Sequence, residues 1–188
     1  DALVPERVLA EFQKGLETPV PCRMLDVLEA CGLWRRLFPQ VRLTTEVRAR
    51  IHRACSMRLP AAMRLALITA GLADGAAAKA FLAGMRASAE AQDYAAILGD
   101  RAELIARLAS PADACALFRT CDALRRRSRM ETLLDYRECV LTPDERGAAT
   151  HEALLKALEA WCSVDAGAIA RSAPNPREIP VRVLAARE

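Results

Sequence analysis

The sequence predicts an all-α protein, a helical array without a sheet. Hydrophobic residues make up 53% of the 188 positions but aromatic residues only 4%, so alanine supplies much of the apolar content, as in closely packed helices. Apolar residues recur at three- and four-residue spacing, which is typical of helices with one buried side. Strands are not indicated, because period-two alternation is short and the hairpin dipeptide Asn-Gly is missing.

The first two helices are expected on either side of a proline break. The first begins at Pro5, and the second begins at Pro21 and stops at Gly32. A short apolar turn closed by Pro39 follows, and a third helix opens at Thr45. The apolar stripes of these three helices are Val8, Leu9, Phe12 and Leu16; Met24, Leu25, Leu28 and Cys31; and Val47, Ile51 and Cys55. The segment from Pro60 to Leu72 is apolar nearly all round and is predicted to be the central buried helix.

Three later helix starts share one pattern, in which a capping residue precedes a proline and an acidic residue follows. The capping side chain accepts a bond from a free amide, the proline needs no such bond, and the carboxylate meets the positive helix end. Pro180 would lack a donor inside the last of these helices, so its regular turns are expected to begin near Ile179. The three starts are Ser110-Pro111, Thr142-Pro143 and Asn175-Pro176.

The composition and the motifs also limit the cellular compartment and the kinds of site that the sequence predicts. No apolar run approaches the roughly 20 residues that span a bilayer, and the chain opens without a signal segment, so we expect a soluble, cytoplasmic protein with no membrane partner. The 7 cysteines contain no C-x-x-C pair, which favours inert core thiols over a zinc site or a disulfide framework. Nucleotide-binding motifs such as a P-loop, an Asp-x-Asp pair or a Gly-Ser turn are missing from the sequence.

A resemblance to a known family rests mainly on the segment from Pro5 to Pro39. Its motif residues are Glu6-Arg7-Val8, Glu11-Phe12, Leu16, Pro19, Leu25, Leu28, Gly32-Leu33 and Leu37-Phe38-Pro39. This stretch resembles the neck of bacterial class II tRNA nucleotidyltransferases, the CCA-adding enzymes, and of their poly(A) polymerase relatives. In that family the neck directly follows a nucleotide-binding head. Two later segments resemble family helices more loosely: Ala116 to Arg126, and Arg177-Glu178-Ile179 through Arg187.

The middle of the chain resembles the HD phosphohydrolase region of many such enzymes, with its chemistry lost. His52 stands where the first metal-binding histidine would lie, and Thr69 and Ala70 stand where the His-Asp pair would lie. The chain holds only 2 histidines, and a catalytic metal needs several ligands together. We therefore expect a degenerate HD-like body without metal or catalytic residues, with His52 at most a relic of the motif.

The candidate RNA contacts are arginines, which supply 24 of the 27 basic residues. Arginine grips phosphate with a planar two-point fork, which lysine does not offer. Arg125, Arg126, Arg127 and Arg129 form the densest cluster and are predicted to lie at a helix C-terminus. Arg35 and Arg36 flank a tryptophan that we expect to be packed into the neck. The alternative for all six is a solvated helix surface.

The sequence therefore predicts one compact unit with neck helices at 1–40, a degenerate HD-like body at 41–136 and tail helices at 137–188. By the resemblance, the chain would bind the acceptor/T-arm backbone of tRNA, and its other partner would be the absent N-terminal head. The parent enzyme would add CMP and AMP from CTP and ATP with Mg²⁺, whereas this part would need no cofactor and be inactive alone. Two alternatives stay open: the equivalent part of a poly(A) polymerase, and a non-catalytic helical scaffold or homodimerisation module.

Overall fold

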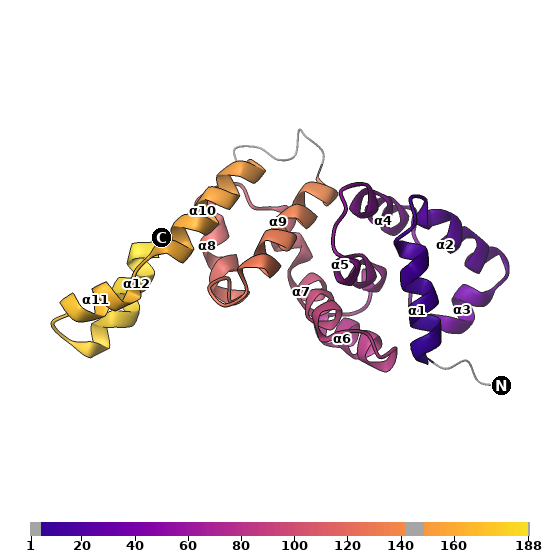
Figure 1. Cartoon of the computed structure of the whole chain (residues 1–188), viewed down its shortest axis with the longest axis horizontal. Coiled ribbons are helices and arrows are strands. Elements are labelled where there is room, and N and C mark those ends of the chain that lie inside the picture. The colour runs from indigo at the N-terminus through magenta and orange to yellow at the C-terminus, as the bar shows by residue number, and fades with distance from the viewer. Residues whose placement is uncertain (1–4, 142–148, 188) are drawn as a thin grey trace. The chain divides into compact units, whose positions relative to one another are not determined.

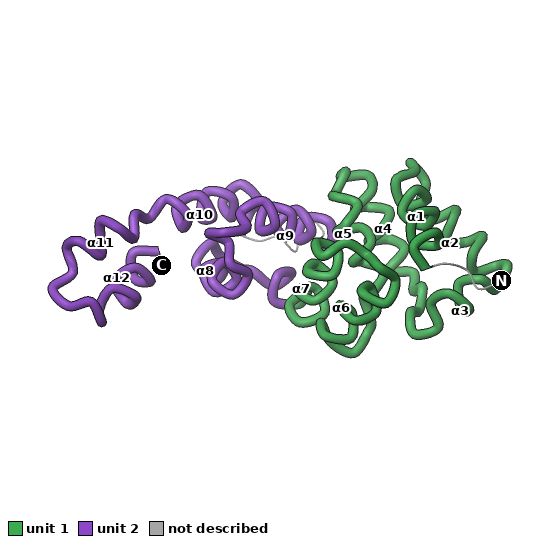
Figure 2. Tube along the Cα trace, turned by 60° about the horizontal axis from the view of Figure 1, so that its bottom comes forward, with its two compact units in different colours: residues 1–103 green, residues 104–188 purple. Residues whose placement is uncertain are grey.

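The structure is a computed structural model that describes residues 5–141 and 149–187. The prediction of an all-α fold is confirmed, since every regular element among these residues is a helix (Figure 1). The chain divides into two compact units, residues 1–103 and residues 104–188, and the division falls inside the seventh helix (Figure 2). The three segments predicted from the sequence as neck, body and tail stay a prediction. No helix in the described ranges is long and apolar enough to cross a membrane.

The first unit contains seven α-helices and one 3-10 turn among its described residues. They are α1 (Pro5–Leu16), α2 (Pro21–Ala30), α3 (Leu33–Leu37), α4 (Thr45–Ser56), α5 (Ala61–Ala66), η1 (Leu67–Thr69), α6 (Gly75–Gly84) and α7 (Ala89–Ala106). The predicted starts at Pro5, Pro21 and Thr45 are confirmed, and Thr44 caps α4 by accepting the amide of Val47 at 3.2 Å. Gly32 has a φ of +73°, which explains why the second helix ends there.

The central apolar segment is buried as predicted, but its helix is shorter than the sequence indicates. α5 ends at Ala66 and continues as a single 3-10 turn to Thr69. The Thr69 hydroxyl donates to the Ala66 carbonyl at 2.7 Å, and Gly71 then turns the chain with a φ of +96°. A local side-chain bond and a positive φ thus stop the helix before Leu72, which the apolar pattern alone does not reveal.

The second unit contains the last helices. They are α8 (Pro111–Thr120), α9 (Arg127–Val140), α10 (His151–Ser163), α11 (Ala166–Ser172), η3 (Pro176–Glu178) and α12 (Ile179–Arg187). The Ser110 start is confirmed as a complete capping box with Asp113, and Asn175 opens η3 with α12 following at Ile179 as expected. The predicted start at Thr142 lies outside the described residues.

A buried arginine organises the core of the second unit. The Arg137 side chain is fully buried and donates to the carbonyls of Leu108 at 2.8 Å and Ala149 at 2.9 Å. It also forms a 3.3 Å ion pair with Glu138. Leu108 follows α7 and Ala149 precedes α10, so one guanidinium satisfies the carbonyls of two chain segments that flank helices. The core of this unit also contains buried apolar side chains of α8, α9 and α10, including Phe118, Leu133, Leu158 and Trp161.

The prediction of core thiols is wrong for most of the cysteines. Only Cys121 and Cys139 are buried, four others are partly exposed, and Cys31 is exposed. Cys31 falls just past the end of α2, where the chain turns away from the core, so the apolar stripe no longer points inward.

Candidate nucleic-acid interface

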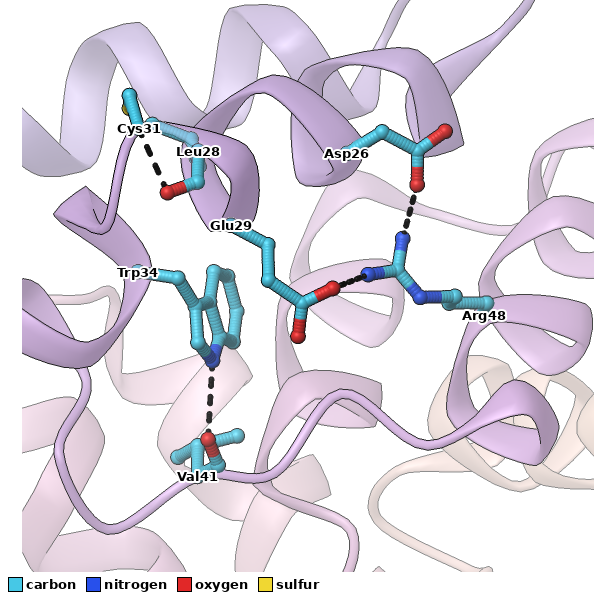
Figure 3. Close-up of polar contacts among 7 residues, drawn as sticks. All are labelled: Asp26, Leu28, Glu29, Cys31, Trp34, Val41 and Arg48. Carbon is cyan, nitrogen blue, oxygen red and sulfur yellow. Dashed lines mark hydrogen bonds and ion pairs between the residues drawn. The ribbon is translucent and has the colours of Figure 1, made fainter.

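Trp34 anchors the short helix α3 in the first unit, as the sequence predicts. Its side chain is 2% exposed, and its ring lies 4.6 Å from that of Phe38 and 6.0 Å from that of Phe12, measured between centroids. The indole Nε1 donates to the Val41 carbonyl at 2.9 Å (Figure 3). The helix and the extended segment after it are therefore held together by one buried side chain.

Arg35 and Arg36 directly follow this anchor and are both exposed. Successive helical residues are about 100° apart, so a helix that buries Trp34 turns the next two side chains toward its flank and outer side. No side chain within the described ranges forms an ion pair or hydrogen bond with either guanidinium. The two predicted contacts are therefore available to an anionic partner.

Arg48 links α4 to α2 through ion pairs with two carboxylates. Its guanidinium contacts Asp26 and Glu29, which both lie on α2 (Figure 3). The Arg48 side chain is only 20% exposed, so these contacts are less screened than those of a surface pair. Because its positive charge offsets part of the charge of the two acidic groups, they repel a polyanion less than free carboxylates would.

Most arginines of α4, of α5 and of the turn between them have partners within the protein. Arg50 pairs with Glu46 in the same helix, and Arg64 donates to the carbonyls of Leu59 at 2.7 Å and Leu16 at 3.0 Å. With Arg48 also paired, the arginines that stay exposed on α4 and in the turn directly after it are Arg53 and Arg58.

The arginine cluster of the second unit lies in a different position from the one predicted. α8 ends at Thr120, and α9 begins at Arg127, so Arg127 and Arg129 lie in the first turn of a helix and not at its C-terminus. The prediction is wrong because Asp122 adopts a left-handed conformation with a φ of +52°, which ends α8 early. The helix dipole therefore opposes these two cations and does not favour them.

The four arginines of this cluster also differ in how they are held. Arg127 forms a 2.9 Å ion pair with Glu131, and the partly buried Arg129 donates to the Cys121 carbonyl. Arg125 and Arg126 are exposed in the turn before α9. Contact of any of the four with RNA stays a prediction.

The HD-like positions do not converge on a metal site within the described part of the chain. His52 is exposed on α4, whereas Thr69 is buried in η1. Residues 5–141 and 149–187 contain no group of three His, Cys, Asp or Glu side chains that could hold a metal ion. The second histidine, His151, lies in the other unit, where its Nε2 is 3.4 Å from Asp135.

The inward roles of Arg48, Arg64 and Arg137 could not be inferred from the sequence. Their partners lie 22, 48 and 29 residues away for the contacts to Asp26, Leu16 and Leu108. A local pattern carries no information on such pairs. The one available signal is that Arg64 and Arg137 interrupt otherwise apolar helix sides, as a buried and paired arginine does.

Comparisons with known proteins found one matching family and several similar curated proteins. Residues 2–44, which include α1 to α3 with Arg35 and Arg36, match the family described as "Probable RNA and SrmB-binding site of polymerase A". The whole chain is 38% identical to a CCA-adding enzyme of Bordetella pertussis, of which it covers 49%. It is 32% identical to a multifunctional CCA protein of Cupriavidus taiwanensis, of which it covers 55% over a 232-residue alignment.

The chain thus spans about half the length of the curated relatives that it matches. No solved structure matches it. The resemblance to CCA-adding enzymes and polymerase A relatives that the sequence predicts is confirmed by these comparisons.

Proposed function

We propose that this chain is the tRNA-binding and positioning part of a CCA-adding tRNA nucleotidyltransferase. The observation that carries the proposal is the coincidence of two unpaired, exposed arginines with the segment that matches an RNA-binding family. Arg35 and Arg36 are presented by a helix whose position is set by a buried tryptophan, so their charges are held on a rigid support.

The expected mode of binding is contact with the RNA backbone. Helical RNA offers a narrow major groove that side chains cannot read, so proteins bind it mainly by shape and phosphate contacts. Arginine forks fit that task, and exposed arginines occur in both units of the chain. The acceptor/T-arm of tRNA is the partner that this proposal specifies, and cytoplasmic location follows from it.

The chemistry of CMP and AMP addition belongs, in this proposal, to a nucleotide-binding head. Transfer from CTP and ATP needs carboxylates that hold Mg²⁺. The sequence lacks the Asp-x-Asp pair, and no described residues form a metal-binding group. The residues present therefore do not fit the metal, and the part played by this chain is to hold the tRNA for the head.

Salt-dependent binding tests the proposal directly. The chain would be titrated with an unmodified tRNA transcript that lacks its 3′ CCA, at several salt concentrations. We expect binding at low salt whose logarithmic affinity falls linearly with the logarithm of the salt concentration, because counterions are released from the phosphates. Undetectable binding at low salt, or an affinity independent of salt, would exclude the proposal. The remaining alternatives would then be a scaffold and a homodimerisation module, and sedimentation would reveal the latter as a stable dimer.

A further inference from the structure

Three helices of this protein end on a non-glycine residue in the left-handed conformation. These residues are Arg58, Arg86 and Asp122, with φ values of +57°, +62° and +52°. At Arg58 the ending is a Schellman motif, in which the Leu59 amide donates to the Ala54 carbonyl at 2.9 Å. Glycine is the usual residue at this position because it has no Cβ to clash there. A bulky side chain in its place needs a reason.

For two of the three residues, the described structure explains why a side chain other than glycine is tolerated in the left-handed conformation. Asp122 is of a type that tolerates the left-handed region. The Arg86 guanidinium lies 3.6 Å from the carboxylate of Glu6, which links the end of α6 to α1. Arg58 has neither reason, since it is exposed and no residue within 5–141 or 149–187 pairs with its side chain.

The helix dipole does not account for Arg58 either. A cation at a helix C-terminus is favoured by the dipole, but this holds equally for Arg86 and does not require the strained residue itself to carry the charge. The last turn of α4 already supplies a cation, Arg53, which is exposed and also has no acidic partner in the described ranges. The acidic residue of the same helix, Glu46, is taken by Arg50.

We infer that the C-terminal end of α4, through Arg53 and Arg58, is a second contact site for the sugar-phosphate backbone of RNA. It lies outside residues 2–44, which match the RNA-binding family, and it adds two uncompensated guanidinium groups to the same unit. The backbone strain at Arg58 is retained because the site needs a cation there, as strained residues at functional sites often are. This inference rests on the proposed function and adds specific residues to it.

A matched pair of glycine substitutions tests the inference. Arg58→Gly and Arg86→Gly remove the same side chain from the same backbone conformation and relieve the same strain. We expect both variants to keep the helical circular dichroism of the parent, with a thermal midpoint no lower than that of the parent. Only Arg58→Gly should weaken binding of the tRNA transcript, with the salt slope reduced in magnitude by about 0.9, the value for one lost phosphate contact. Arg58→Lys, which keeps the charge, should retain most of that slope.

The outcomes separate this inference from the function on which it rests. If the parent chain fails to bind the transcript, the proposed function fails. If the parent binds and Arg58→Gly binds with the same affinity and salt slope, only the α4 site is excluded. An equal loss in both glycine variants would assign the effect to net charge and would also exclude a specific site at α4.

Discussion

The indole Nε1 of Trp34 donates a 2.9 Å hydrogen bond to the carbonyl oxygen of Val41, and both residues are buried. The bond spans the turn between α3 and the segment that leads into α4, so it sets the position of the helix that carries Arg35 and Arg36. The candidate RNA contacts of the first unit thus depend on a residue that never reaches the surface.

Replacement of this tryptophan should be costly. Trp34→Phe keeps an aromatic ring but leaves the Val41 carbonyl without its donor, and we expect a loss of about 2 kcal/mol in the free energy of unfolding. Urea unfolding followed by circular dichroism measures it. Trp161→Phe is the matched control, because no described residue accepts a hydrogen bond from the buried Trp161 Nε1. An equal cost in the two variants would show that ring packing alone stabilises α3.

Removal of the two exposed charges of α3 should affect binding and leave stability alone. Arg35→Gln with Arg36→Gln should lower tRNA affinity and reduce the magnitude of the salt slope by about 2, since two phosphate contacts are lost. Arg171→Gln with Arg182→Gln removes the same charge from arginines that are paired with Asp165 and Glu178. If that control pair weakens binding as much, the effect is one of net charge and the α3 site is excluded.

Arg137→Ala should unfold the second unit preferentially. The change removes the Arg137 ion pair from Glu138, whose side chain is only 10% exposed, and it removes the guanidinium donors of two carbonyls. Broken buried pairs typically cost about 3–5 kcal/mol. In a Trp34→Phe background, the fluorescence of Trp161 reports on the second unit alone. Arg182→Ala, which breaks an exposed pair with Glu178, should cost less than about 1 kcal/mol by the same measurement.

Cys31 should react first with a thiol reagent. It is the exposed cysteine, whereas burial raises the pKa of the Cys22 and Cys55 thiols and so lowers their thiolate fraction at neutral pH. Iodoacetamide labelling of the folded protein, read by peptide mass spectrometry, checks the order. Cys31→Ser should remove the fast phase, and a fast phase that persists would assign it to another cysteine.

Asp135 should make stability fall as pH rises through the acidic range. Burial raises the pKa of this carboxyl in the folded state above its ordinary value of 3.8, although His151 opposes the shift. The folded state then holds its proton more tightly than the unfolded state, so the stabilisation is complete below pH 3.8 and is lost as pH rises through the folded pKa. Asp135→Asn should lack this contribution. Above pH 4, the free energy of unfolding of the parent should therefore fall relative to that of the variant. A difference between the two that stays constant with pH would contradict the assignment.

The sequence alone determined the helical class and several helix starts, because these depend on local interactions. The cap at Ser110, the prolines at Pro5 and Pro21 and the glycine at Gly32 each act within a few residues of their own position. The sequence pattern around Trp34 likewise predicted that this residue is buried and that Arg35 and Arg36 are exposed. It failed at the second arginine cluster, where the left-handed Asp122 ends α8 earlier than the apolar pattern suggests.

Only the tertiary structure decided which arginines are free to meet a ligand. Arg48, Arg64 and Arg137 are of the same residue type as Arg35 and Arg58. Each of the first three, however, also contacts a group that lies 22, 48 or 29 residues away in the chain, respectively. Such pairs form when helices pack, and packing brings together groups whose separation along the sequence carries no signal. The sequence therefore determined how many arginines the protein has and on which helices they lie, while the packing of those helices determined which of them are engaged within the protein.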